Sequence, residues 1–251
     1  MKPQHLLLCA IPMAFAACEG PSYSFRAGPI FADVRGDLAL ASSAGQLPTA
    51  NSMDGGLGFD DSKSAYFEGQ VDIDRHRARI STMQIDSEGA AVLDQDYGDI
   101  VAGTAVNTEH DFTSVVANYS YEFIREEGYR IGLGAQLGYY AMDVNVRGAG
   151  VPGRELLETD GFMPMPYFEA EAFVDDVTFG ASGGIMYGDW GDARGHYWDL
   201  DLYSVWNLSD RFDVRGGYRY IVLNGDGRAS SRDFDSDWDV QGFYLTFGAL
   251  F

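Results

Sequence analysis

The residues best suited to chemistry are charged side chains that recur at alternate positions along apolar segments. Residues two apart in an extended strand lie on one face, so each segment presents its charged groups together. Carboxylates and guanidinium groups gathered in this way either neutralise one another or line a path for cations. The set consists of Glu68, Asp72, Arg77, Arg79, Glu169, Glu171, Asp199, Asp201, Asp213, Arg215 and Arg219. The sequence leaves open whether these groups form a closed charge network or line a narrow pore.

Two histidines near carboxylates make hydrolysis a second candidate chemistry, because a histidine paired with an acid can activate water or a serine hydroxyl. His110 stands between Glu109 and Asp111, and His196 lies between Asp192 and Asp199. Ser114 or Ser204 would have to serve as the nucleophile, and nothing in the sequence singles out either one. We therefore expect no catalytic residues and no enzyme, with a hydrolase as the weakest alternative.

A third cluster is acidic and lies near the carboxyl terminus. Carboxylates at Asp233, Asp235, Asp237 and Asp239, with Asp226 nearby, are groups that Ca²⁺ and Mg²⁺ prefer. The calcium-loop pattern fails, since Trp238 stands where a glycine is needed and no glutamate follows at the right spacing. We expect no metal centre and no cofactor here, but an acidic external surface that can attract divalent cations.

The segments that must position these side chains alternate with period two, which is typical of strands exposed to different surroundings on their two faces. We predict about ten strands, at 30–40, 65–74, 77–87, 113–123, 131–141, 168–174, 177–187, 198–206, 212–222 and 238–251. One face of most strands is apolar or aromatic, and the other is charged, small or glycine. The third strand changes parity at Met83 and Ile85, which predicts a bulge or a different register.

Long and short connections alternate along the chain. Long polar connections are expected at 42–62, 88–108, 145–161, 189–195 and 224–237, and tight turns at 74–76, 125–128, 175–176 and 209–211. Such asymmetry is typical of transmembrane barrels, which have short turns at one end and longer loops at the other.

The composition limits the class of protein. The chain has 251 residues, a net charge of −21 and 31 glycines. This charge argues against nucleic acid as a partner and against attachment to anionic lipid through basic patches. Past residue 17 there is no apolar run long enough for a spanning helix. A membrane form of this chain would therefore have to be a closed barrel, in which every backbone polar group is paired.

The amino terminus reads as a secretory signal. Residues 1–17 combine a short basic segment with an apolar one, and residues 18–28 read as a linker. Ala14-Phe15-Ala16 fits ordinary cleavage, whereas Phe15-Ala16-Ala17-Cys18 resembles a bacterial lipobox, in which Cys18 would be lipidated. Both alternatives stay open. Cys9 and Cys18 are the only cysteines, so no disulfide framework is expected.

The last strand carries the resemblance to a known family. Apolar residues fall on alternate positions up to the final residue, namely Phe243, Leu245, Phe247, Ala249 and Phe251. This stretch resembles the C-terminal strand by which Gram-negative outer-membrane barrels are recognised for assembly, and the likeness extends over nearly the whole mature chain. It implies a single all-β, antiparallel, up-and-down transmembrane β-barrel of about ten strands over 29–251, with both termini in the periplasm. The implied partners are outer-membrane lipid, lipopolysaccharide and the barrel-assembly machinery. A secreted lipocalin-like barrel is the alternative fold.

For function we expect a structural or interaction barrel of the outer membrane, with a charged lumen and acidic external loops. The alternative is a narrow cation-favouring channel for ions or small solutes, and a hydrolase at the barrel rim is less favoured. The deciding observation is whether Arg77, Arg79, Arg215 and Arg219 reach the inward carboxylates, because a paired network would close the lumen.

Overall fold

The computed structural model describes residues 20–46, 49–59, 62–150, 153–190, 193–229 and 232–251, with side chains at 189, 190, 193 and 229 left out. The predicted signal peptide and Cys18 lie outside these residues. The described chain forms eleven strands: β1 Ser22–Leu40, β2 Asn51–Ser52, β3 Ser62–Ile73, β4 His76–Val92, β5 Ala105–Arg125, β6 Tyr129–Gly148, β7 Arg154–Val174, β8 Val177–Trp190, β9 Ala193–Ser209, β10 Phe212–Ala229 and β11 Arg232–Leu250. Among the described residues, no helix is long and apolar enough to cross a membrane.

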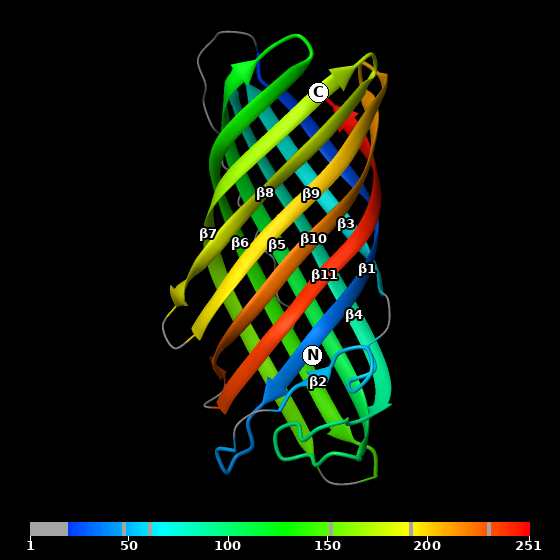
Figure 1. Ribbon diagram of the computed structural model, residues 1–251. Coiled ribbons are helices and arrows are strands. Elements are labelled where there is room, and N and C mark those ends of the chain that lie inside the picture. The colour runs from blue at the N-terminus through cyan, green and yellow to red at the C-terminus, as the bar shows by residue number, and fades with distance from the viewer. Residues whose placement is uncertain (1–19, 47–48, 60–61, 151–152, 191–192, 230–231) are drawn as a thin grey trace.

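The strands form a closed ring in chain order (Figure 1). β11 pairs antiparallel with β1 from Ser24↔Leu250 to Leu40↔Phe234. At the end of this seam, Tyr23 and Phe251 exchange backbone hydrogen bonds of 3.1 and 2.9 Å. β2 is a two-residue segment beside β1, and the other strands make the wall. The predicted all-β, up-and-down barrel is confirmed, and its seam lies between the first and last strands.

We call the end of the barrel with the tight turns the turn end, and the opposite end the loop end. At the turn end, the connections fall where the sequence predicts them, and Asp74 and Asp175 adopt positive φ of 54° and 51°. Aspartate tolerates this conformation, which a tight hairpin turn requires. Phe251 lies at this end, while β2 lies at the loop end (Figure 1).

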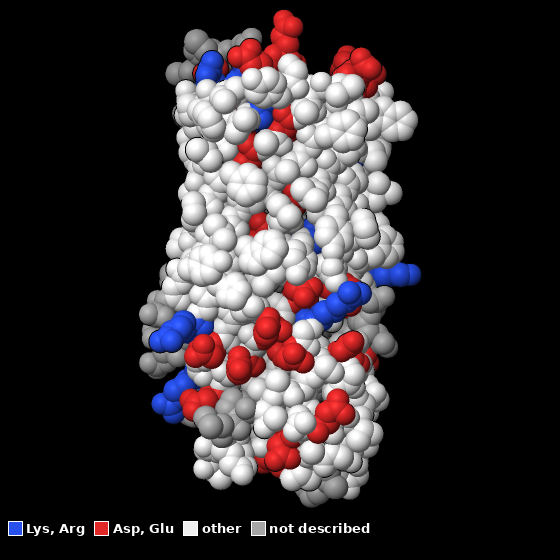
Figure 2. Space-filling view, in the orientation of Figure 1, with Lys and Arg blue, Asp and Glu red and all other residues white. Residues whose placement is uncertain are grey.

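An apolar belt surrounds the half of the barrel next to the turn end. It is built from outward-facing, exposed residues of every long strand, including Phe25, Phe67, Ile80, Tyr121, Leu133, Phe168, Phe179, Leu202, Phe212 and Phe247. Of the proposed assembly residues, Phe243, Leu245, Phe247 and Phe251 face outward with 67, 55, 54 and 79% exposure. Figure 2 shows a mostly uncharged upper half, with acidic and basic residues gathered on the lower half.

The strands continue beyond the belt, and this corrects several predicted loops. Residues 145–161, 189–195 and 224–237 are largely strand. β6 continues to Gly148 and β7 starts at Arg154, β8 continues to Trp190 and β9 starts at Ala193, and β10 continues to Ala229 and β11 starts at Arg232. Their carboxylates suggested loops, but they lie on one face of strands whose other face is apolar. On β7, for example, Glu158 faces outward while Leu157 is buried. Only the first two connections at the loop end are long.

The predicted parity change in β4 also arises because the strand continues beyond the apolar belt. Arg77 and Arg79 face inward near the turn end, and Met83 and Ile85 face inward further along. The pairing of β4 with β3 and with β5 is continuous, so the predicted bulge is wrong. The inner surface instead changes from charged to apolar as the strand leaves the belt. Similarly, the apolar face of 30–40 points into the barrel.

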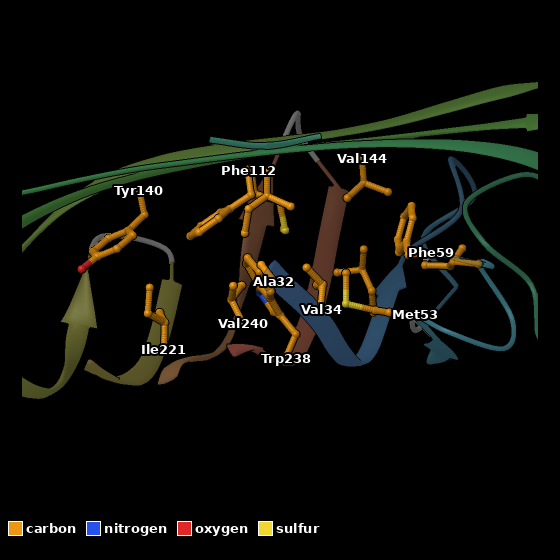
Figure 3. Packing of buried hydrophobic residues seen from close by; sticks show 14 of the residues in the cluster. Ala32, Val34, Met53, Phe59, Phe112, Tyr140, Val144, Ile221, Trp238 and Val240 are labelled. Atoms are coloured by element: carbon orange, nitrogen blue, oxygen red, sulfur yellow. The ribbon is translucent and has the colours of Figure 1, made fainter. Parts of the chain in front are cut away.

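An apolar core fills the loop half of the barrel. Figure 3 shows Phe112, Tyr140 and Val144 from one wall facing Val34 and Trp238 from the other. The first two long connections cover this core with buried side chains, Met53, Leu57, Phe59, Leu93, Tyr97 and Ile100. A backbone hydrogen bond from Gly98 N to Leu40 O at 2.9 Å fixes the second connection to the wall. The side chain of Asn51 links the two connections, since its Oδ1 accepts from Gln95 N at 3.0 Å.

The first strand begins earlier than predicted. β1 starts at Ser22, so most of the 18–28 linker is strand. Glycine and proline obscure its alternation, yet its backbone pairs with β3 on one side and β11 on the other. Tyr23 and Phe25 face outward, and Arg26 faces inward and is buried.

Candidate functional site

The centre of the lumen is occupied by Arg215, which is 1% exposed. Its Nη1 donates to both carboxylate oxygens of Glu68, at 2.6 and 2.7 Å. Its Nη2 donates to Asp201 at 2.5 Å, and its Nε donates to the hydroxyl of Tyr244 at 3.0 Å. The guanidinium lies over the ring of Tyr203, 3.8 Å from the centroid. The contact with Glu68 spans the lumen, because Glu68 is on β3 and is separated from β10 by β1 and β11, whereas the other partners lie on the neighbouring strands β9 and β11.

A second arginine completes the coordination of Glu68. Arg26 Nη1 donates to Glu68 at 2.9 Å, while its Nε and Nη2 donate to Asp213 at 3.0 and 2.7 Å. The sequence analysis missed Arg26 because it placed residue 26 in a linker. The available signal was parity, since Arg26 is four residues before Ile30 and therefore on the same face of a strand.

The other predicted charges extend the network around the wall. Arg77 pairs with Asp72 at 2.5 Å, Glu171 at 2.9 Å and Glu169 at 3.5 Å. Arg79 approaches Glu68 at 3.9 Å and Glu169 at 3.7 Å, and Arg219 pairs with Asp199 at 2.7 Å. The structure therefore brings all the predicted lumen charges into one region, each within 4.0 Å of an opposite charge.

Several further residues belong to this site. Near the turn end, Arg130 pairs with Glu122 at 2.9 Å and also with Glu171. Polar residues satisfy the remaining carboxylate oxygens: Ser120 donates to Glu169 at 2.9 Å, and Gln136 donates to Asp199 at 3.1 Å. Glu122, Ser120 and Gln136 were not among the predicted lumen residues. The available signal was parity, because each lies on the inward face of its strand.

The network leaves little free space at the middle of the lumen. The cavity there, lined by Tyr66, Arg79, Gln136 and Asp201 among others, measures about 20 Å³. That is room for about one water molecule. A buried charge costs several kcal/mol of desolvation unless it is paired, so these side chains hold one another in place.

Larger cavities lie on either side of this constriction. The one toward the turn end measures about 580 Å³ and is lined by charged residues such as Arg77 and Glu171. The one toward the loop end measures about 320 Å³ and is lined mainly by apolar residues such as Met142 and Trp238. The charge network therefore divides the lumen into a polar and an apolar compartment.

The predicted histidine site at 109–111 is not assembled. His110 is fully buried against the rings of Phe59 and Trp238, with centroids 5.1 and 6.0 Å away. Neither ring nitrogen has a hydrogen-bond partner in the described chain. Glu109 and Asp111 point outward, because neighbours in a strand face opposite sides. His110 lies beyond the apolar belt, where burial lowers its pKa to about 4.

The second histidine does not pair with Asp199, the one predicted acid that lies in the described residues. His196 Nε2 hydrogen-bonds the Asn224 amide at 3.0 Å, whereas Asp199 is engaged with Arg219. Asp192 lies outside the described residues. Ser114 is buried without a hydrogen-bond partner in the described chain, and Ser204 lies on the opposite face from buried Tyr203 and Val205. The structure shows no serine paired with a histidine and an acid within the described ranges.

The acidic cluster is part of the wall and not of a loop. Asp233, Asp235, Asp237 and Asp239 lie on β11 and point outward, and Asp226 lies beside Asp235 on β10. The pKa of Asp239 is raised, chiefly by partial burial. Within the residues that the structure covers, no group of three or more His, Cys, Asp or Glu could hold a metal ion.

Comparison with known proteins identifies the fold. No family model matches the chain, and no curated protein matches it in sequence. The outer membrane protease OmpT from Escherichia coli matches with a TM-score of 0.54 at 10% identity, over 92% of this chain and 96% of OmpT. Neisserial surface protein A matches at 13% identity with a TM-score of 0.34, over 92% of this chain and 99% of that one. Ail of Yersinia pestis matches at 10% identity with a TM-score of 0.41, over 92% and 99%.

The similarity to OmpT shows the fold alone. The chain has the architecture of the small Gram-negative outer-membrane β-barrel proteins, as the final strand predicts.

Proposed function

We propose that this protein is a closed, non-conducting β-barrel of the Gram-negative outer membrane, with an interaction role on its outer side. The observation that carries the proposal is the hydrogen bonding of Arg215 to Glu68 across the lumen, with Asp201 of the neighbouring strand β9 as the second acceptor. A buried arginine held by two carboxylates from other strands leaves no path for ions at this level.

The location is supported by the apolar belt, which is the surface that lipid requires. In this arrangement the turn end faces the periplasm, since outer-membrane barrels have short periplasmic turns. Ser22 and Phe251 then also lie on the periplasmic side, because β1 begins and β11 ends at the turn end. The exposed, alternating apolar residues up to Phe251 are the feature that the barrel-assembly machinery would recognise.

The interaction role is supported by the half of the barrel that extends beyond the belt. Its outer wall carries outward carboxylates on several strands, including Asp86, Asp111, Asp143, Asp160, Asp235 and Asp237. At this level they would meet the phosphate and sugar groups of lipopolysaccharide. Divalent cations would be needed between two negatively charged surfaces, and we propose lipopolysaccharide as the partner on this basis.

A cation channel and a hydrolase are less well supported. A channel would require the network around Arg215 to open, and the free volume beside it is about 20 Å³. A hydrolase would require a histidine near an acid or a serine, and neither His110 nor His196 has that arrangement in the described chain. We therefore propose a role without catalysis.

The test is current measurement on the purified protein in planar lipid bilayers. We expect no discrete conductance steps for the wild type. The double variant R79A/R215A removes two large side chains from the constriction but leaves the apolar core of the loop half and the connections that cover it in place, so it should also stay silent. A control, R35A, changes an arginine on the outer wall and should stay silent. Stable cation-selective steps in the wild type would refute the closed barrel.

A further inference from the structure

The barrel wall is incomplete between β7 and β8. Their ladder runs only from Tyr167↔Gly184 to Val174↔Val177. β7 nevertheless begins at Arg154, and β8 continues to Trp190. Between the last paired residues and the loop end, these two strand edges are therefore not joined by ladder hydrogen bonds. The β3–β4 ladder also stops early, at Tyr66↔Met83, but there the first long connection covers the barrel.

The sequence of β7 explains where this ladder stops. Pro164 and Pro166 have no N–H and cannot donate to a neighbouring strand. The ladder to β6 continues past both prolines, through Leu137↔Pro164 and Ala135↔Pro166. The ladder to β8 ends at Tyr167, directly beside them. The missing donors thus fall on the β8 edge, and the opening is specified by two residues.

The apolar cavity of about 320 Å³ lies behind this opening, with residues of both β7 and β8 in its lining. Its volume is at the lower end of the range of about 300–1,000 Å³ for small-molecule sites. Phe112, Met142 and Trp238 form its buried part, and Met163 and Met186 are half-buried at its edge. Methionine side chains adapt to ligands of different shape.

The surroundings of the opening indicate how a ligand would arrive. Phe162, Ile185 and Tyr187 flank it on the outside, with 56, 46 and 73% exposure. They continue the apolar belt, so a molecule dissolved in lipid could reach the cavity without crossing water. Within the cavity lining, the Asn224 side-chain oxygen is buried and has no hydrogen-bond partner in the described chain. It can accept one hydrogen bond from a ligand.

We propose that this cavity binds a free apolar solute of one or two rings bearing at most one hydrogen-bond donor, which enters sideways between β7 and β8. The inference rests on the proposed membrane location and gives the outer half of the closed barrel a ligand. The test measures binding of the solute and not ion current through the barrel. A loss of binding with no current rejects the site alone, whereas a current in the wild type rejects the closed barrel whatever binds.

The experiment uses Trp238, which lines the cavity, as the reporter. In the full-length protein, Trp190, Trp198 and Trp206 are replaced by Phe, and the barrel is reconstituted in lipid nanodiscs. The probe is 6-bromo-2-naphthol, whose bromine quenches indole fluorescence and whose hydroxyl can donate to Asn224. We expect saturable quenching. 2-Bromonaphthalene, which lacks the donor, should bind more weakly.

Two cavity-filling variants provide the decisive comparison. A Cβ added at Gly161 or Gly188 meets no atom within 4 Å, so a side chain at either position starts in open space, and leucine would extend it into the cavity that these glycines line. G161L and G188L should weaken binding about tenfold or more, equivalent to a loss of about 1.4 kcal/mol. The control, A117L, adds the same side chain on the exposed outer face of β5 and should bind normally.

A third variant tests the route of entry. P164T/P166T restores two N–H donors to the β8 edge, and we expect slower association of the probe. Quenching that is linear in probe concentration, or unchanged in both glycine variants, would overturn the site. Quenching of Trp238 by lipids with brominated acyl chains, with no competition from the naphthol, would show that a lipid tail is the occupant and overturn the proposal of a free solute.

Discussion

Arg215 donates hydrogen bonds of 2.6 and 2.7 Å to the carboxylate of Glu68, although the two residues are 147 positions apart in the chain. Both are 1% exposed, and they come from strands on different parts of the wall. The pair is the central contact of the network that divides the lumen, and it depends on closure of the ring.

Removing one partner should leave an uncompensated charge. We expect R215A and E68A each to destabilise the folded barrel by about 3–5 kcal/mol, the usual cost of breaking a buried ion pair. The measurement is denaturant unfolding in lipid vesicles, followed by the loss of fast migration on gels without boiling. R228A removes an exposed arginine that lies 3.5 Å from Asp233, and its effect should stay below about 1 kcal/mol. Equal stability of all three variants would contradict the central role of the pair.

The rings packed against Arg215 depend on neighbouring glycines. A Cβ at Gly180 would lie 2.3 Å from the Tyr203 ring, which covers the Arg215 guanidinium and donates to Glu171 at 2.5 Å. G180A should displace Tyr203 and destabilise the barrel by about 1–3 kcal/mol, the usual cost of overpacking. The same unfolding assay checks this. Gly216 is a matched control, since a Cβ there meets its nearest atom at 3.7 Å and G216A should be close to neutral.

His110 should make stability depend on pH. Burial lowers its pKa in the folded barrel from 6.5 to about 4. As the pH falls from about 6.5 to 4, the unfolded chain takes up a proton that the folded barrel does not, so stability decreases across this window. The loss at full extent is about 3 kcal/mol, at about 1.4 kcal/mol per pKa unit.

Unfolding at pH 7 and pH 5 measures this effect. Carboxylates also titrate over part of the range, so the comparison is with H110L, in which the His110 contribution is absent. The difference between the two pH values should be smaller in H110L than in the wild type. An identical difference in both proteins would show that His110 is satisfied by a partner.

The side chain of Phe251 should matter for assembly more than for stability. It is 79% exposed, and its contribution to the seam comes from backbone hydrogen bonds with Tyr23. F251A should therefore lower the yield of folded barrel in the outer-membrane fraction several-fold, while the barrel that does form unfolds like the wild type. The measurement is immunoblotting of unboiled samples, followed by denaturant unfolding. A normal yield would mean that the final aromatic is not the recognised feature.

The sequence by itself determined the strands, the tight turns and the sides on which the lumen charges lie. These depend on period-two alternation, which is a local property: Phe243, Leu245 and Phe247 must share one face whatever the rest of the chain does. The sequence analysis missed the outer half of the barrel for the same reason. Glu158 and Asp235 resemble loop residues if every outward face is assumed to contact lipid.

Only the tertiary structure decided which charge meets which, and where the lumen is closed. Arg215 finds Glu68, and Arg26 finds Asp213, through the stagger and closure of the ring, which brings together strands distant in sequence. That Glu109 and Asp111 turn away from His110 is instead a local consequence of the strand, because neighbours in a strand face opposite sides. The opening beside Pro164 and Pro166 is determined partly by the sequence and partly by the tertiary structure. The missing donors are visible in the sequence, but only the pairing with β6 and β8 shows which neighbour they leave unbonded.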